Sequence, residues 1–123
     1  MRKPTMRNAE INKTIALKYA NRTGNITDLG FGVNQFEYGT VNEMNVCLLD
    51  FSDAFEAQAY GVNLTGGKKA TLTFEQAIQI NEFTHLWIET TPSTDKQNSE
   101  YKVVKTPQVI NSGLLIIEKI HGN

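Results

Sequence analysis

Two glycine-containing segments are the first places where this sequence could bind a ligand. Asn63–Thr71 reads NLTGGKKAT and contains a Gly-Lys step, as phosphate-binding loops do. In a P-loop the Gly-Lys step, here Gly67-Lys68, is preceded by another glycine five positions before its glycine and followed directly by Ser or Thr. In this chain the first of these positions is Val62 and the second is Lys69. Gly30-Phe31-Gly32 lacks the third glycine of a dinucleotide-binding loop. We therefore interpret both segments as turns that lead into strands.

Side chains suited to acid–base or metal chemistry are few and scattered. His85 and Trp87 alternate along one predicted strand and share a face, where we expect them to pack together. Glu89 and Glu100 are candidates for proximity, but nothing marks them as an acid/base pair. Cys47 is the single cysteine, which we expect to be a small buried group in a strand. The sequence predicts no catalytic residue, metal site or cofactor, and a protein that is not an enzyme.

Composition favours one globular domain spanning residues 1–123. The chain is 40% hydrophobic and 20% charged, which is ordinary for a folded protein. The net charge of −1 disfavours tight, sequence-independent binding of nucleic acid, although weak contact with passing DNA stays open. Met1-Arg2-Lys3 is followed by no apolar signal segment, and the aliphatic run Leu114–Ile117 is too short to span a bilayer. We expect a soluble protein in a reducing compartment.

Alternation of apolar and polar residues predicts a mainly all-β fold, a small β-barrel of about six to seven strands with long loops. The expected strands are Ile11–Tyr19, Gln35–Leu49 with a bend near Gly39, Ala70–Phe74, a short edge piece Ile78–Ile80, His85–Thr90, Tyr101–Lys105 and Leu114–Ile120. The last strand is apolar on both faces, which is typical of a central strand. The predicted core comprises Ile15, Leu17, Val46, Leu48, Leu72, Ile88, Val103 and Ile116.

One short helix is expected between Ser52 and Tyr60. Ser52 is the candidate N-cap and Gly61 the stop signal. Phe51, Phe55 and Ala59 repeat at i, i+4 and i+8, and we expect this apolar stripe to lie on the barrel. The long polar connections are Asn21–Asn34, Tyr60–Lys69 and Thr91–Ser99. Long loops in a small domain commonly carry function, so these three are candidate functional segments.

Several short motifs follow one another in a definite order. Arg22-Thr23 opens a segment that ends in Gly30-Phe31-Gly32, and an aromatic–polar strand then runs from Phe36 to Val41. Ser52 to Ala59 reads SDAFEAQA, a Thr-rich strand follows, and an aliphatic strand closes the chain at Glu118-Lys119-Ile120. In this order the chain resembles the head–tail joining proteins, also called head-closure or stopper proteins, of long-tailed bacteriophages. The resemblance covers about Ile11 to His121.

This resemblance implies a structural virion protein of the phage neck, assembled in the cytoplasm of the bacterial host. Its copies would form a ring, twelvefold by analogy, between the portal or portal-adaptor ring and a tail-completion or tail-tube protein. The ring would form on that template from a monomeric or weakly associating protein. It would line part of the DNA channel, touch passing double-stranded DNA transiently, retain packaged DNA and have no membrane partner.

Three alternatives stay open. The first is a neighbouring neck protein or a tail-completion (terminator) protein. The second is a small β-barrel module that binds a ligand or nucleic acid, for which Tyr38, Trp87 and Tyr101 would be the exposed aromatic platforms. The third is a small enzyme, which would need a pocket with convergent titratable groups, for which the sequence offers only His85, His121 and scattered carboxylates.

Two loops receive roles under the resemblance. The docking loop, a tip before a strand, comprises Asp28, Gly30, Phe31, Gly32 and Val33. The channel or gating loop comprises Tyr60, Gly61, Val62, Asn63, Leu64, Thr65, Gly66 and Gly67. The second loop carries no cation that would hold phosphate. Val62 and Leu64 would close the pore by packing around the ring axis.

Overall fold

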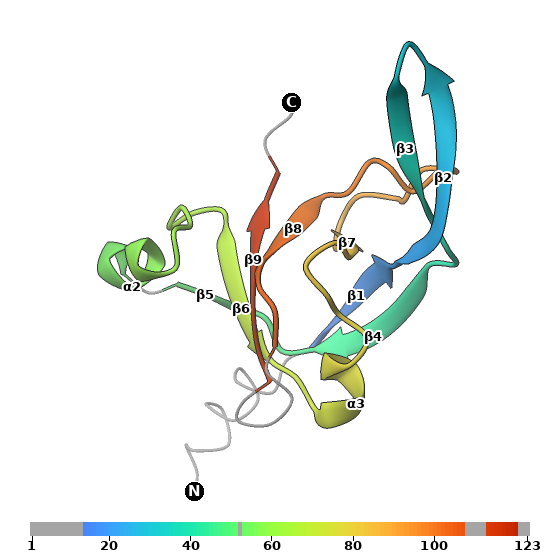
Figure 1. Ribbon diagram of the computed structural model, residues 1–123. Helices are drawn as coiled ribbons and strands as arrows, with labels where there is room; N and C mark the ends of the chain where they lie inside the picture. The colour runs from blue at the N-terminus through green and yellow to red at the C-terminus, as the bar shows by residue number, and fades with distance from the viewer. Residues whose placement is uncertain (1–13, 52, 108–112, 121–123) are drawn as a thin grey trace, which may run out of the picture.

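The computed structural model describes residues 14–51, 53–107 and 113–120, and most of these residues lie in or between antiparallel strands (Figure 1). The elements are β1 (Ile15–Ala20), β2 (Arg22–Gly30), β3 (Val33–Tyr38), β4 (Asn42–Val46), β5 (Leu49–Asp50), α2 (Ala54–Ala59), β6 (Gly67–Thr71), α3 (Phe74–Ala77), β7 (His85–Trp87), β8 (Tyr101–Lys105) and β9 (Leu114–Lys119). The predicted all-β class is confirmed.

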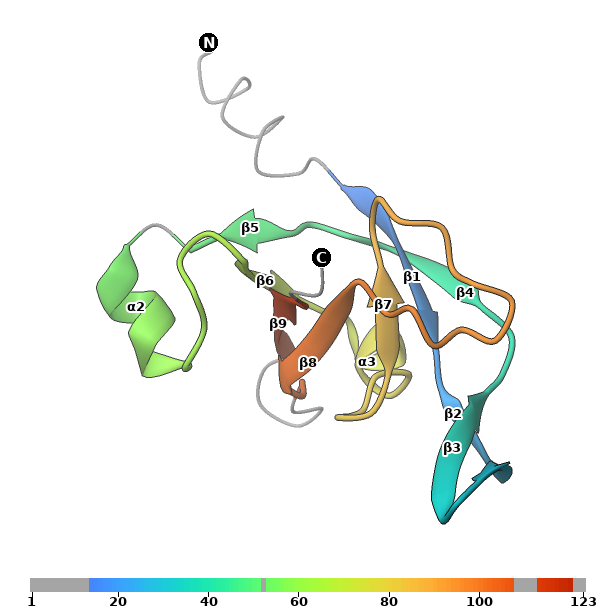
Figure 2. The same cartoon turned by 90° about the horizontal axis from the view of Figure 1, so that it is seen from above.

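Seven strands form one curled sheet in the order β4-β1-β7-β8-β9-β6-β5, and β2 and β3 form a separate two-stranded sheet. The edge strands β4 and β5 are separated in the sequence only by Cys47 and Leu48. The chain therefore runs directly from one edge of the curl to the other, which Figure 2 shows from above. The sheet is curled into a half-barrel, and this connection spans the distance between its two edges. Cys47 lies between these strands and is half-buried, so its predicted place inside a strand is wrong.

The core lies on both faces of the central strand β9. Leu115, Ile116 and Ile117 are all fully buried. Successive side chains of a strand point to opposite faces, so Leu115 and Ile117 join the larger apolar cluster and Ile116 joins a smaller one. All eight predicted core residues pack in these clusters: Leu17, Val46, Leu72 and Ile116 are buried, while Ile15, Leu48, Ile88 and Val103 are partly buried. The predicted core and the central last strand are confirmed.

The segment Asn21–Asn34, predicted as a loop, is mostly strand. β2 covers Arg22–Gly30 and pairs with β3 as an antiparallel hairpin. Most residues of β2 are exposed, so neither of its faces shows the apolar alternation that marks a half-buried strand. The predicted long strand Gln35–Leu49 is divided into β3, β4 and β5, with the first break near Gly39 as expected. Ile11, expected in the first strand, lies outside the described residues.

A second helix, α3, takes the end of one predicted strand. Of the predicted strand Ala70–Phe74, Ala70 and Thr71 lie in β6 and Phe74 begins α3, and the predicted edge piece Ile78–Ile80 is a turn after the helix and not a strand. β6 ends at Thr71, and Thr73 begins a capping box in which its Oγ1 accepts the Gln76 N–H at 3.2 Å. The Gln76 side-chain oxygen accepts the Thr73 N–H at 3.0 Å in return. Phe74 and Ile78 therefore belong to α3 and its C-terminal end. The T-x-x-Q spacing is a known helix-start signal and would have predicted this helix.

Candidate functional site

A hairpin formed by β2 and β3 stands out from the half-barrel in both views (Figures 1 and 2). We call Arg22–Tyr38 the hairpin arm. Its two strands pair through Ile26 with Phe36 and through Asp28 with Asn34, and the register shifts near each end. Residues paired directly across an antiparallel ladder share a face. The arm is therefore a regular two-stranded element that carries side chains on two open faces.

The tip of the arm is the predicted docking loop. Asp28 Oδ1 accepts the Gly30 N–H at 2.8 Å, and Gly30, Phe31 and Gly32 all have positive φ angles, of 93°, 55° and 77°. Glycine tolerates this region, whereas a phenylalanine there is strained by an amount of order 1–3 kcal/mol. The Phe31 side chain is nevertheless fully exposed. Phe31 and Gly32 are the two central residues of the tight turn between the paired residues Gly30 and Val33, and such hairpin turns require positive φ at both positions. The turn therefore explains the backbone of Phe31, while its exposed ring is the feature that another molecule could cover.

Further apolar side chains follow the tip along both strands. They are about half exposed: Ile26, Leu29, Val33 and Phe36. Sequence reasoning included Val33 in the docking loop and missed the other three, because isolated apolar residues in a polar stretch give no periodic signal. With Phe31 at the tip they place unburied apolar surface on both faces of the arm: Ile26 and Phe36 are paired across the ladder and share one face, and Val33 points to the other. Such surface is a mark of interaction sites.

The root of the arm is held firmly to the half-barrel. The Arg22 guanidinium carbon lies 3.7 Å from the centre of the Phe36 ring and 3.9 Å from that of Phe83. The Tyr38 hydroxyl donates to the Phe83 carbonyl at 2.7 Å, and the Gln97 side chain donates to the Phe36 carbonyl at 2.7 Å. These contacts fix the direction of the arm while leaving its tip in solvent.

Aromatic rings continue from this root into the half-barrel. Tyr38 stacks on His85 with ring centres 3.8 Å apart, and His85 meets Trp87 edge-on at 6.2 Å. The expected packing of His85 with Trp87 is confirmed. Burial lowers the pKa of His85 below its ordinary value and the nearby Arg22 charge acts in the same direction, while the hydrogen bond with the Lys96 carbonyl, 2.7 Å from Nδ1, opposes them.

The predicted aromatic platforms do not face a ligand together. Trp87 is fully buried and its Nε1 donates to the Asn98 carbonyl at 3.0 Å. Tyr101 is buried as well. Base stacking requires exposed rings. The expectation that Tyr38, Trp87 and Tyr101 offer a stacking surface is therefore wrong, and the binding-module alternative loses the residues that motivated it.

Glu89 and Glu100 meet as expected, in a structural arrangement. Glu100 is 7% exposed, and its Oε1 accepts the backbone N–H groups of Ile88, Glu89 and Thr90 at 2.8, 2.9 and 3.0 Å. Burial alone would raise the pKa of Glu100, but these donors lower it below its ordinary value, and Lys119 contributes in the same direction. Glu100 thus clamps the start of the long Thr91–Ser99 loop in ionised form.

The predicted gating loop is only partly open to solvent. Val62 is 7% exposed and packs in the smaller cluster with Phe51, Ala57 and Ile116. Val62 is therefore unavailable to close a pore, which corrects its predicted role. Leu64 is 40% exposed, so of the two residues predicted to close the pore, Val62 and Leu64, only Leu64 can be contacted by another chain.

Both ends of the same loop are tied to the body. Gly61, with φ of 73°, ends α2 as expected. Tyr60 lies against the Phe51 ring at 5.9 Å between centroids. The Asn63 N–H donates to the Glu118 carboxylate at 2.9 Å, and Gly67 is the first residue of β6. The exposed part is therefore short and centred on Asn63–Gly66, with Thr65 at its middle.

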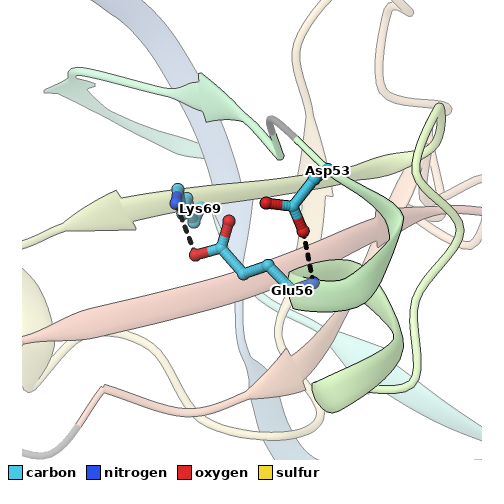
Figure 3. A network of polar contacts seen from close by, with 3 residues as sticks. All are labelled: Asp53, Glu56 and Lys69. Carbon is cyan, nitrogen blue, oxygen red and sulfur yellow. Dashed lines mark hydrogen bonds and ion pairs between the residues drawn. The ribbon is translucent and has the colours of Figure 1, made fainter.

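Helix α2 is fastened to the sheet by the polar contacts in Figure 3. Asp53 Oδ1 accepts the Glu56 N–H at 2.8 Å, and the Glu56 carboxylate pairs with Lys69 of β6 at 2.7 Å. Asp53 is the N-cap, so the expected cap at Ser52, which lies outside the described residues, is corrected.

The predicted apolar stripe is wrong for Phe55. Phe51 is buried, but Phe55 is 86% exposed. Phe51 precedes the N-cap and does not follow the helical phase, and Ala57 is the buried residue of this short helix.

Comparison with protein-family models, curated proteins and solved structures returned no match to this chain. No helix within the described residues is long and apolar enough to cross a membrane. Among the same residues, no three His, Cys, Asp or Glu side chains are grouped to hold a metal ion. The shape and surface of the molecule itself are therefore the basis for a functional proposal.

Proposed function

We propose that this protein is a structural component of the neck of a long-tailed bacteriophage, where it joins the DNA-filled head to the tail. The observation that carries the proposal is the hairpin arm. Its root is fixed by Arg22 and Tyr38, while the Phe31 side chain at its tip is fully exposed to solvent. Apolar surface held out on a rigid element gains free energy when another protein covers it. A sequentially built joint needs this kind of preformed connector.

The partners follow from this role. Copies of the chain form a ring between the portal or portal-adaptor ring and a tail-completion or tail-tube protein. The net charge of −1 supports the proposal, because a conduit for DNA works best when few cations hold the passing phosphates. Two separate elements give each copy surfaces for these contacts, the hairpin arm and the exposed Asn63–Gly66 segment, which follows α2 at the other end of the molecule.

Within this role, Leu64 is the candidate gate. The Tyr60–Gly67 segment is uncharged. Its first half is anchored by Val62 and by the Asn63–Glu118 contact, and its end is anchored by the Gly66 carbonyl, which accepts the Lys119 N–H at 2.9 Å. Leu64 residues from several copies would pack together at the channel axis and retain packaged DNA. A phage with Leu64→Ser should package its genome and then lose it from the head before tails attach. Normal genome retention in that phage would remove the gate from the proposal.

The joining role is tested in the phage that carries this gene by replacing Phe31 with serine. Phe31 has no packing role in the monomer, so the variant should fold normally and still fail to connect. Infected cells should accumulate DNA-filled heads and separate tails, which electron microscopy distinguishes from intact virions. Phe74→Ser is the matched control, since Phe74 is also an exposed phenylalanine but lies on α3. A normal yield of virions from the Phe31→Ser phage would contradict the joining role of the arm.

A further inference from the structure

Helix α2 presents an uncharged, largely apolar face to solvent. Ala54, Phe55, Gln58 and Ala59 are exposed, whereas Ala57 faces the smaller core cluster. The charged Glu56 is drawn to Lys69 on β6. Phe55 and Ala59 are four residues apart and therefore lie on the same side of the helix. An amphipathic helix normally buries its apolar side, so this face lacks its cover within the described chain.

The hairpin arm and α2 lie at opposite ends of the molecule. Both views show α2 at one side of the half-barrel and the arm projecting at the other (Figures 1 and 2). Two different surfaces at opposite ends allow identical copies to join head to tail, whereas a twofold dimer needs one patch that matches itself. The chain thus carries both halves of a repeating contact.

We infer that the tip of the hairpin arm of one copy packs on the exposed face of α2 in the next copy. Phe31 and Val33 of the arm cover Phe55 and Ala59 of the neighbour. The contact repeats from copy to copy. The further statement that the repeated contact closes a ring depends on the proposed function. The contact itself requires only a second copy of this chain.

The size of the arm sets the strength of this contact. Phe31 is fully exposed, and four other apolar residues of the arm are about half exposed. If a large apolar side chain carries roughly 200 Å² of surface, the fully exposed Phe31 and the half-exposed Val33, which make the contact, offer on the order of 300 Å². A stable interface typically buries about 800 Å² on each partner. Two free copies therefore associate weakly, and many copies held on a template associate firmly because each is held at both ends.

A second apolar surface competes as a receptor for the arm. It is a groove beside α3, lined by the apolar residues Ala77, Ile78, Ile80, Phe83 and Pro107 and by three polar ones, among them the acidic Glu82. Phe83 also contacts Arg22 at the arm's root, so an incoming arm would lie beside the outgoing one. The α2 face avoids this crowding. Placing a probe at Ile78 distinguishes the two receptors.

Disulfide trapping in the purified full-length protein tests the contact. In a Cys47→Ser background, one copy carries Val33→Cys and a second copy, distinguishable by a tag, carries Ala59→Cys. These positions keep Phe31 and Phe55 in place. Under mild oxidation the mixture should form a disulfide-linked dimer between position 33 of one copy and position 59 of the other, the 33–59 dimer. Its yield should be several-fold higher than the yield of 33–33 dimer from the first variant alone or of 59–59 dimer from the second variant alone. Adding Phe31→Ser to the Val33→Cys copy should reduce the 33–59 yield to the level of those single variants.

Three results would overturn the inference. A 33–33 dimer as abundant as the 33–59 dimer would indicate a twofold contact. A higher yield between Val33→Cys and Ile78→Cys would place the arm in the α3 groove. A 33–59 dimer yield that stays unchanged when Phe31→Ser is added would show that the disulfide forms by random collision and not through the proposed contact. Thermal unfolding of each variant confirms that it is folded. Because the experiment uses no phage, its failure is separate from failure of the proposed neck role.

Discussion

Replacing Glu100 with glutamine removes one charge from a buried acceptor and leaves its shape almost unchanged. The Glu100 carboxylate oxygen now accepts three backbone N–H groups, from Ile88, Glu89 and Thr90. A hydrogen bond to a charged group contributes about 1.5–3 kcal/mol and a neutral one about 1 kcal/mol, so the charge adds roughly 1 kcal/mol per donor. The three donors together lose about 3 kcal/mol in Glu100→Gln.

Part of that loss is offset, because a neutral amide costs less to bury than a carboxylate that is 7% exposed. We therefore expect the free energy of unfolding to fall by about 2 kcal/mol. Urea unfolding followed by the fluorescence of Trp87, the single tryptophan and fully buried, measures this change. Glu89→Gln is the matched control: its side chain is exposed and its backbone N–H is retained, so it should change stability by less than about 0.5 kcal/mol.

The pH dependence gives a second test of the same clamp. The pKa of Glu100 is lowered in the folded state. Its contribution is therefore fully present above the ordinary glutamate pKa and is lost as pH falls through the lowered folded value. Glu100→Gln should remove this part of the acid loss of stability. The reasoning would be refuted if Glu100→Gln had the same urea unfolding midpoint as Glu89→Gln and lost stability at acid pH to the same extent as the unsubstituted protein.

Three further changes test other parts of the structure. Asp53→Ala removes the N-cap of α2 and should lower the unfolding free energy by about 1 kcal/mol in urea titration, and no change would show that the cap is idle. Val62→Ser should lower the free energy of unfolding by about 2 kcal/mol or more, because the Val62 side chain is buried. Leu64→Ser should lower it by less than about 0.5 kcal/mol, because Leu64 is partly exposed. Equal decreases for the two variants would contradict their different burial. The pKa of His85 is lowered in the folded state, so folding favours the neutral imidazole. The free energy of unfolding should therefore decrease as the pH falls from the ordinary histidine pKa through the lowered folded value. An NMR titration of His85 in the folded protein that gives an ordinary histidine pKa would contradict this.

The parts of the fold that the sequence predicts well are those where burial imposes a period. Leu115, Ile116 and Ile117 are apolar at consecutive positions because β9 is covered on both faces. Tyr101–Lys105 was predicted with the bounds that the structure has. Both strands lie inside the curled sheet, where one residue's shift would move buried side chains to the wrong face.

The candidate site was harder to predict because solvent surrounds it. The tip at Gly30-Phe31-Gly32 was predicted from its glycines, but β2 was missed because its residues face water on both sides. α3 was missed because alternation across Ala70–Phe74 suggested a strand, while the capping box at Thr73 decided the local structure. The exposure of Phe55 depends on where α2 begins, which the stripe pattern alone does not fix.

Locating the protein in purified virions tests the central claim most directly. Under the proposed neck role the gene belongs to a long-tailed phage, and gold-labelled antibody raised against the full-length protein, imaged by electron microscopy on that phage, reports the position of the protein. The account predicts label at the junction between head and tail in intact virions, and no label there when a null mutant yields separate heads and tails. Label confined to the tail tip or capsid shell, or purified virions that lack the protein, would contradict it.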